Sequence, residues 1–260
     1  GNDFSYDLGF ILSDSQAEIT KYENPSGTLS DYYVGQKIGE IWGYETEGFY
    51  QSDTDVQNHA DQSKLGANWA PGDIMYKDLD GNKKINNGSN TLDDHGDLKV
   101  IGNTTPRYQY GITANMSYKN VYFNVCFQGI GKRDFWPSSQ PFWPVATQYY
   151  NTQKWFVTDS WSEDNRDAYF ARPIARETKN QQKQTKYLQD ASYCRLKNLT
   201  VGYDFPKSWL SFLHVAKAGV YFSAVNLFEF TNVKGAYDPE AAGKNGTMVY
   251  PFQRTYSFGL

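Results

Sequence analysis

The strongest constraint on the fold is a pair of long alternating segments at residues 107–128. In the first segment every second side chain is apolar, namely Tyr108, Tyr110, Ile112, Ala114, Met116 and Tyr118. A period of two is typical of a β-strand with one apolar and one polar face. The alternation resumes at Val121, directly after Lys119 and Asn120. The pattern therefore predicts a hairpin of two long strands joined by a tight turn.

The length of these strands leaves two environments open for the apolar face. Strands in soluble domains usually have about 5–6 residues, whereas about 9–11 residues form a tilted strand that crosses a bilayer. The apolar face of the hairpin could therefore face lipid, or it could face the core of a soluble β-sandwich. Alternation alone does not decide between them.

The composition narrows the class of protein. The chain has 260 residues, of which 17% are aromatic and only 39% hydrophobic, and its mean hydropathy is -0.69. A transmembrane β-barrel has such a polar average because its lumen and loops are polar. No run of about 18 apolar residues exists, which excludes helical membrane spans. A net charge of -4 argues against a nucleic-acid partner.

The rest of the chain repeats the strand pattern between long irregular regions. Further strand-like segments lie at residues 3–13, 16–23, 192–205, 217–228 and 253–260, and the clearest helical pattern is a short one near 52–63. The irregular regions span about 24–106 and 130–186. Outer-membrane barrels have this asymmetry, with short periplasmic turns and long extracellular loops. We therefore expect periplasmic turns at Lys119-Asn120 and at 204–210, and extracellular loops at the two long regions.

No pattern in the sequence indicates catalysis. The three histidines, His59, His95 and His214, are scattered without the spacing of metal ligands. A nucleophile elbow, a P-loop and a dinucleotide fingerprint are all missing. Cys126 and Cys194 have no metal-type spacing either, and both a disulfide and two free thiols remain open. We expect a protein that is not an enzyme.

Several blocks of sequence, in order, carry a family resemblance. They are Gly-Glu-Ile-Trp-Gly-Tyr-Glu-Thr-Glu-Gly-Phe-Tyr at 39–50, the blocks at 71–86 and 101–111, the block at 187–206 that contains Leu-Lys-Asn-Leu-Thr-Val-Gly-Tyr, and those at 224–231, 237–240 and 250–259. Together they closely resemble the C-terminal third of the SusC/RagA-like TonB-dependent outer-membrane transporters of Bacteroidetes. The resemblance covers nearly the whole chain.

The resemblance implies an all-β fold in which residues 1–260 are the C-terminal segment of an antiparallel transmembrane β-barrel of about 22 strands. It further implies TonB-driven import of oligosaccharides, or of peptides in some members, across the bacterial outer membrane. A SusD-like lipoprotein would cap the barrel. The N-terminal plug and the TonB-contacting segment of the family have no counterpart in this sequence, so we expect a part of a longer transporter that cannot transport alone.

With this resemblance, lipid is the favoured environment for the apolar face of the hairpin. Tyr108, Ile112, Met116, Val121, Val125 and Phe127 are then predicted to face lipid, and Gln109, Thr113, Asn115, Asn124 and Gln128 to face the lumen. Arg195 and Lys197 have the parity that is apolar later in their strand. At mid-bilayer each would cost roughly 2–4 kcal/mol on the lipid face. We therefore place both charges near the extracellular rim.

A run of oxygen donors suggests a calcium loop. Asp78, Asp80 and Asn82 have the spacing of positions 1, 3 and 5 of an EF-hand-type loop, and the carbonyl of Lys84 would be position 7. Hard oxygen ligands at this spacing can wrap a Ca²⁺ ion.

Two departures leave the calcium hypothesis open. Lys83 stands where the loop prefers glycine, and Ser89 stands where it has a bidentate glutamate. Asp93, Asp94 or Asp97 could supply the missing carboxylate after an insertion, and we take Asp93 as the candidate. The alternative is an ion-free surface loop rich in Asx turns.

Aromatic side chains are concentrated at 135–161. Rings among polar neighbours can stack on sugars or anchor a protein interface. Trp136 and Trp143, which lie beside prolines, are the candidates for contact with a ligand or a partner. Trp155, Phe156 and Trp161 are expected to pack inside the loop. An interfacial aromatic girdle or a small core of the loop itself would also explain these rings.

Two functions from different classes therefore remain. The first is a part of an outer-membrane importer that contacts lipid, a lipoprotein partner and an oligosaccharide or peptide. The second is a soluble β-rich module, stabilised by calcium, that binds glycans through the aromatic loop. The second function requires closed sheets without an uncovered apolar face.

Overall fold

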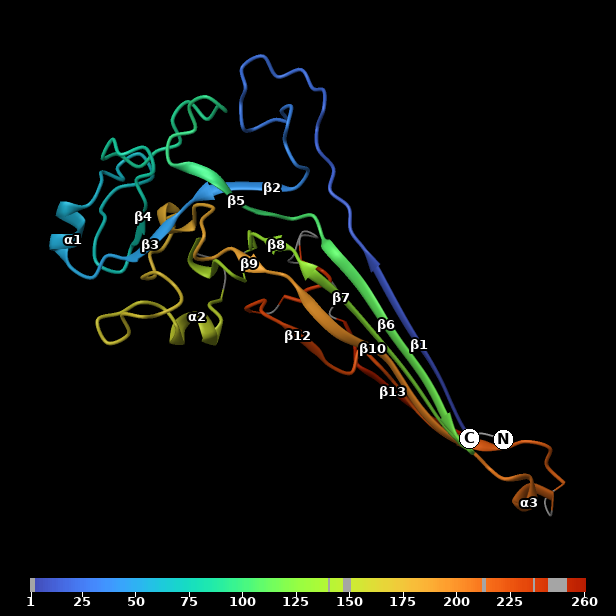
Figure 1. The fold of residues 1–260 in the computed structure, drawn as a ribbon. Coiled ribbons are helices and arrows are strands. Elements are labelled where there is room, and N and C mark those ends of the chain that lie inside the picture. The colour runs from blue at the N-terminus through green and yellow to red at the C-terminus, as the bar shows by residue number, and fades with distance from the viewer. Residues whose placement is uncertain (1–2, 140, 147–150, 212–213, 236, 243–251) are drawn as a thin grey trace.

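The computed structural model describes residues 3–139, 141–146, 151–211, 214–235, 237–242 and 252–260. Its main element is one antiparallel sheet whose long strands extend away from a mass of loops (Figure 1). The strands lie in the order β1 (Phe4–Ser13), β6 (Arg107–Tyr118), β7 (Val121–Lys132), β10 (Tyr193–Asp204), β11 (Gly219–Val225) and β13 (Thr255–Gly259). A short strand, β12 (Glu229–Thr231), also pairs with β10.

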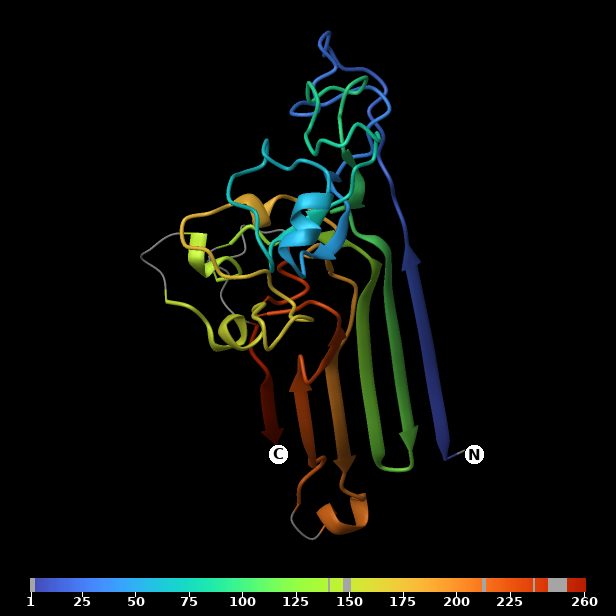
Figure 2. The same ribbon diagram turned by 90° about the vertical axis from the view of Figure 1, so that its left-hand side faces the viewer.

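The long strands follow one another as an up-and-down meander. The turn between β6 and β7 and the connection between β10 and β11 lie at one end of the sheet, and the long connections between the other long strands lie at the opposite end (Figure 2). The predicted hairpin is confirmed, because Tyr118 pairs with Val121 across a turn of Lys119 and Asn120. The connection between β10 and β11 contains the single-turn helix α3 (Lys207–Leu210).

The smaller elements lie in the loop region. β2 (Glu40–Tyr44) pairs with β5 (Leu98–Asn103), β3 (Thr46–Phe49) with β4 (Ile74–Tyr76), and β8 (Asp134–Phe135) with β9 (Gln189–Asp190). The helices are α1 (Asp53–Asn58) and α2 (Lys154–Thr158), and the 3₁₀ turns are η1 (Pro144–Ala146) and η2 (Lys179–Gln181). The expected helix near 52–63 forms in a shorter version, and the side chain of Ser52 caps it by accepting from the Asp55 N–H.

One predicted strand is wrong. Residues 16–23 alternate, but they form only an isolated bridge between Glu18 and Lys37. The backbone of Ile19 bonds to Gln36 and Gly35 of the same loop instead of joining a sheet. Alternation needs a neighbouring strand to become a sheet, and this segment lies beyond the end of β1.

The register of the sheet aligns side chains of one kind into rows. Tyr6, Met116, Phe123, Val201, Phe222 and Phe258 are paired across all six long strands, as are Leu8, Ala114, Val125, Leu199, Ala224 and Tyr256. Between these two rows, on the opposite face, lie Asp7, Asn115, Asn124, Thr200, Ser223 and Ser257. The sheet therefore has one continuous apolar face and one polar face.

The apolar face has no second layer over it. Tyr6 is 67% exposed and Phe258 is 81% exposed. The two clusters of buried apolar side chains found among the described residues both lie in the loop region. A soluble sandwich would pack a second sheet on this face, and the described residues contain no such sheet.

A β-bulge in β10 corrects the placement of Arg195. The register slips between Leu196 and Asn198, so Lys197 is an extra residue. Leu196 and Leu199 consequently lie opposite Phe127 and Val125 on the apolar face, and Arg195 lies opposite Gln128. Strict alternation assigned Arg195 the apolar parity, but the bulge moves it to the polar face.

Two further observations concern the cysteines and helical spans. Cys126 and Cys194 are free thiols in the structure. None of the helices in the described ranges is both long and apolar enough to cross a bilayer.

Candidate functional site

A buried arginine joins the sheet to the last loop. The side chain of Arg195 is only 1% exposed, and its Nη2 lies 2.6 Å from Asp238 Oδ2 and its Nη1 2.8 Å from Glu240 Oε1. Glu229 of β12 lies 3.7 Å from its Nε, and Lys197 Nζ contacts Glu240 at 3.0 Å. Charge-assisted bonds of this kind fix geometry. The segment at 237–240 is thereby held against β10.

A second buried ion cluster ties two long loops together. The carboxylate of Asp73 is buried and accepts from Arg172 Nε at 2.8 Å, Lys179 Nζ at 2.9 Å and Asn180 Nδ2 at 2.9 Å. Burial works to raise the pKa of Asp73, but the hydrogen bonds from Arg172, Asn180 and Lys179 outweigh it and hold that pKa below its ordinary value. The cluster connects the loop after β3 with the loop before β9.

Most of the aromatic residues between 135 and 161 that the structure describes build the core of the loop region; Tyr149 and Tyr150 lie outside the described residues. Phe156, Trp161 and Trp143 are buried there, and Trp155 packs against them. The ring of Phe170 lies 4.6 Å from that of Phe156, centre to centre. The expected packing role of Trp155, Phe156 and Trp161 is confirmed.

The structure places the two candidate tryptophans in contact with each other. Trp143 is 8% exposed, and its Nε1 donates to the carbonyl of Pro137 at 2.6 Å. Trp136 is half-buried, with its ring centre 6.0 Å from that of Trp143. Both therefore serve the packing of the loop, which was the alternative explanation. Their direct contact with a ligand or partner stays a prediction.

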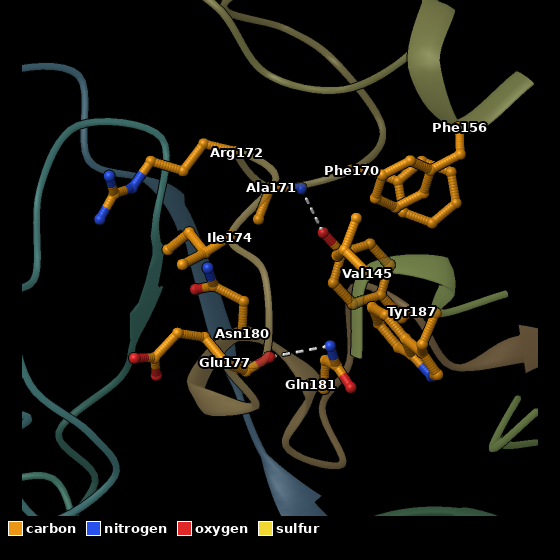
Figure 3. Close-up of a pocket in the computed structure, with 11 residues that line it drawn as sticks. Val145, Phe156, Phe170, Ala171, Arg172, Ile174, Glu177, Asn180, Gln181 and Tyr187 are labelled. Carbon is orange, nitrogen blue, oxygen red and sulfur yellow. Dashed lines mark hydrogen bonds between the residues drawn. The ribbon is translucent and has the colours of Figure 1, made fainter. Parts of the chain in front are cut away.

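A small pocket with a cavity volume of about 20 Å³ opens into this aromatic core (Figure 3). The rings of Phe156, Phe170 and Tyr187 lie on one side of it, and Asn180 and Glu177 on the other. The hydroxyl of Tyr187 accepts from the Ala171 N–H at 2.7 Å, which fixes the ring, and the guanidinium of Arg172 points away from the rings. The pocket is too small for a solute and has room for little more than a water molecule.

The oxygen-rich loop brings three carboxylates together. Ligand atoms of Asp78, Asp80 and Asp97 all lie within 4.8 Å of one another. Asp97 is fully buried, and its two oxygens accept from the N–H groups of Leu79 at 2.7 Å and Asn86 at 2.9 Å. Three carboxylates this close repel one another unless a cation or a proton lies between them.

The backbone of this loop has the shape that an EF-hand-type loop needs. Lys83, at position 6, has a positive φ of 60° although it is not glycine. Asp78 accepts from the N–H groups of Gly81 and Lys83, both at 2.8 Å. Burial works to raise the pKa of Asp78, but these backbone N–H groups outweigh it and lower that pKa. Ile85 is fully buried, and its N–H bonds to the carbonyl of Asp61 at 2.8 Å.

The remaining predicted ligands divide into two groups. The Asn82 Oδ1 accepts from the Lys84 N–H at 2.7 Å, and the Lys84 carbonyl accepts from Asn86 Nδ2 at 3.2 Å, so both residues belong to the loop. Asp93 is exposed and is not one of the three grouped carboxylates, whereas Asp97 is. The residue spacing predicted that Asp78 and Asp80 lie together. It could not predict which later aspartate lies near them, because the insertion between 87 and 96 has no fixed spacing.

The sequence has relatives among curated proteins, although no family model matches it. TonB-dependent receptor P3 of Formosa agariphila is 32% identical over 239 residues, which cover 87% of this chain and 22% of the relative. TonB-dependent receptor SusC of Bacteroides thetaiotaomicron is 25% identical over 272 residues, which cover 99% of this chain and 24% of the relative. The chain therefore spans about a quarter of the length of these relatives.

The fold has relatives among solved structures. The RagAB peptide transporter matches with a TM-score of 0.63 and 22% identity, over 98% of this chain and 27% of that chain. The RagAB peptide importer in its 'open-open' state matches with a TM-score of 0.64 and 22% identity, over 98% of this chain and 26% of that chain. The expected fold, an all-β segment of an antiparallel barrel, is confirmed by this likeness.

Proposed function

We propose that this chain, a SusC/RagA-like TonB-dependent receptor by sequence and by fold, forms part of the wall and extracellular loops of a nutrient importer in the bacterial outer membrane. One observation carries the proposal: six long strands present a continuous apolar face that nothing in the described chain covers. Lipid is the environment that stabilises such a face on a single-layer sheet.

Aromatic side chains at the short-turn end support a membrane boundary there. Tyr118 and Tyr203 lie in one row with Val121 between them, and the rings of Phe205 and Trp209 stack at 6.2 Å. Trp209 is largely exposed. Barrels carry girdles of such rings at the interfaces of the bilayer. The short turns would then lie on the periplasmic side and the loop region outside the cell.

The polar face would line the lumen. The row of Asn115, Asn124 and Thr200 offers uncharged hydrogen-bonding groups beside one carboxylate, that of Asp7, to which Asn115 bonds at 3.2 Å. The solute would be an oligosaccharide or a peptide. A SusD-like surface lipoprotein would cover the loops, and TonB would act through the N-terminal part of the whole receptor. Two relatives support these assignments by their names, SusC and the RagAB peptide transporter.

The soluble glycan-binding module is the weaker proposal. It needs a second layer on the apolar face, and no described residue provides one. A ligand contact through Trp136 or Trp143 fits the importer equally well, because both lie in the loop region. Trp136, the more accessible of the two, is the residue at which substitution would test that contact.

Labelling of neighbouring cysteines on opposite faces tests the importer proposal. Cys126 and Cys194 of the full-length receptor are first replaced by serine, and Thr200→Cys or Val201→Cys is then introduced. Thr200 faces the polar side and Val201 the apolar side of the same strand. In intact cells, a water-soluble maleimide should modify Thr200→Cys through the lumen and leave Val201→Cys unmodified. Equal modification of both would contradict a lipid-facing sheet.

We also propose that the loop from Asp78 to Asp97 binds a structural Ca²⁺ ion. Its support is the convergence of three carboxylates and the EF-hand-like turn at Lys83. Asp78, Asp80, Asn82 and the carbonyl of Lys84 would supply oxygens as the spacing predicts, and Asp97 would take the role first given to Asp93. Bound calcium would neutralise the three carboxylates and fix the loop between β4 and β5.

A further inference from the structure

Two lysines lie against one aromatic ring in the loop region. The Nζ of Lys234 is 4.1 Å from the ring centre of Tyr169, and the Nζ of Lys186 is 5.9 Å from the same centre. Lys186 Nζ also lies 4.3 Å from the ring centre of Phe49 in β3. Each distance is within the range of a cation–π contact. Four segments far apart in the sequence meet here, so only the fold assembles this group.

Neither ammonium group forms an ion pair with a described residue. Within the described ranges, the Nζ atoms of Lys186 and Lys234 contact aromatic rings and form no hydrogen bond. The residues outside those ranges include no aspartate or glutamate, so they cannot supply a carboxylate. Two fully buried cations of the loop region are paired, by contrast: Lys179 lies 2.9 Å from Asp73, and Arg195 lies 2.6 Å from Asp238.

The two positive charges oppose each other. Burial lowers the pKa of the half-buried Lys186, and the charge of Lys234 lowers it further, against a smaller opposite effect of Asp159. Asp159 itself is engaged elsewhere, because its Oδ1 accepts from the Tyr169 N–H at 3.0 Å. An anion between the two ammonium groups would remove this repulsion.

A buried glutamine holds the group in place. Gln189 is 4% exposed; its Nε2 donates to the Tyr169 hydroxyl oxygen at 2.6 Å, and its Oε1 accepts from the Lys234 N–H at 2.9 Å. The Tyr169 hydroxyl therefore already accepts a bond, while its own hydrogen finds no acceptor in the described chain. That hydrogen is free to be donated to a ligand. Donors fixed in advance lower the entropy cost of binding.

We propose that Lys186, Lys234 and the hydroxyl of Tyr169 bind an oxyanion, a carboxylate or a sulfate group carried by a solute. The anion site does not depend on the proposed import function. Only the statement that the bound solute is imported rests on that function. Two ammonium groups and one hydroxyl offer charge-assisted bonds to an anion and no comparable gain to a neutral group. The site would therefore select acidic solutes over neutral ones.

Titration calorimetry on the purified full-length receptor tests this site, at constant ionic strength. The probes are sodium sulfate, sodium glucuronate and, as the neutral control, glucose. We expect at least one anion to bind and glucose not to bind. Lys186→Met and Lys234→Met should each weaken anion binding about tenfold or more, as the loss of a charge-assisted bond predicts. The tighter anion distinguishes a sulfate ester from a carboxylate as the natural group.

Two matched variants make the result specific. Tyr169→Phe, which removes only the hydroxyl, should weaken binding less than either lysine substitution. Lys21→Met removes the same charge from an exposed site elsewhere and should leave the affinity unchanged. Unchanged anion affinity in Lys186→Met would overturn the proposal, and so would failure of both anions to bind.

The melting temperature provides an independent check. Lys186→Met should change the melting temperature only slightly, because it removes the cation–π contacts of the ammonium group and also its repulsion from Lys234. A fall much larger than the loss of a cation–π contact explains would indicate an ion pair of Lys186 with another part of the receptor, which would overturn the proposal. Binding is measured without transport. A receptor that binds anions but imports nothing would contradict the import function alone, and an active importer whose lysine variants bind anions normally would contradict the anion site alone.

Discussion

The guanidinium of Arg195 lies 2.8 Å from a carboxylate oxygen of Glu240, although 45 residues separate the two in sequence. Asp238 accepts a second bond from the same side chain at 2.6 Å. One residue of β10 thereby holds the segment at 237–240, which follows β12. The position of that segment depends on a charge that is almost completely removed from water.

Substitution of Arg195 should destabilise the receptor strongly. Arg195→Met leaves Asp238 and Glu240 without their main partner, and loss of one member of a buried pair costs about 3–5 kcal/mol. The midpoint of urea unfolding of the full-length receptor in detergent measures this cost. Arg254→Met is the control, because Arg254 is 56% exposed and lies 3.9 Å from Glu229; its cost should be about 0–1 kcal/mol. Equal losses would contradict the buried network.

Charge on the two faces of β6 should have unequal effects. Met116 lies on the apolar face and Asn115, its neighbour, on the polar face. Met116→Arg should destabilise the receptor in lipid vesicles by roughly 2–4 kcal/mol if it lies near mid-bilayer, whereas Asn115→Arg should be close to neutral. The difference in unfolding free energy between the two variants is the measurement. A larger loss for Asn115→Arg would reverse the assignment of the faces.

Calcium should raise the melting temperature of the receptor through Asp97. With a chelator present, the melting temperature should fall, because binding to the folded state alone stabilises it. Asp97→Asn should abolish the difference between calcium and chelator, and Asp93→Asn, which alters an exposed carboxylate outside the group, should preserve it. No difference in the unaltered receptor would retire the calcium proposal.

Acid should weaken the link between the two long loops at Asp73. The pKa of Asp73 is held below its ordinary value of 3.8 in the folded state. Its ion pairs therefore contribute stability above about pH 4, and that stability is lost as the pH falls through the depressed folded pKa. Melting curves from pH 5 to pH 2 should show this loss. The Asp73→Asn variant should have a lower melting temperature at pH 5, and its melting temperature should depend less on pH. An unchanged pH dependence would show that Asp73 is not the group responsible.

The strands of the sheet could be predicted because a sheet with one apolar and one polar face requires side chains that alternate with a period of two. β1, β6 and β7 are found within a few residues of the predicted ranges. The bulge at Lys197 could not be predicted, because an extra residue leaves no compositional mark. The short strands β2, β4 and β5 depend on partners far away in the sequence, so local pattern did not reveal them.

The candidate sites were predicted only where their residues are close in sequence. Asp78 and Asp80 have a recognisable spacing, whereas Asp97 returns after an insertion that no spacing rule covers. Tryptophan is a residue type that often contacts a ligand or a partner, which made Trp143 a candidate. The rings that bury it belong to segments far away in the sequence, such as Phe170 and Tyr187. Lys186 and Lys234 are 48 positions apart in sequence (234 minus 186). The fold brings both of their Nζ atoms to the ring of Tyr169, which no sequence pattern predicts.

The bulge at Lys197 reverses the parity of the apolar face within β10. The even-numbered Leu196 before the bulge and the odd-numbered Leu199 after it lie on the same face. Deletion of Lys197 alone would remove the bulge and leave Leu196 and Leu199 on the same apolar face. Insertion of one further residue between Leu196 and Leu199 would instead turn every earlier side chain of the strand to the other face, so Arg195 would meet hydrocarbon and Leu196 the lumen. Insertion scanning of the gene should therefore find the segment from 193 to 199 intolerant of a single added residue, whereas deletion of Lys197 should be tolerated better.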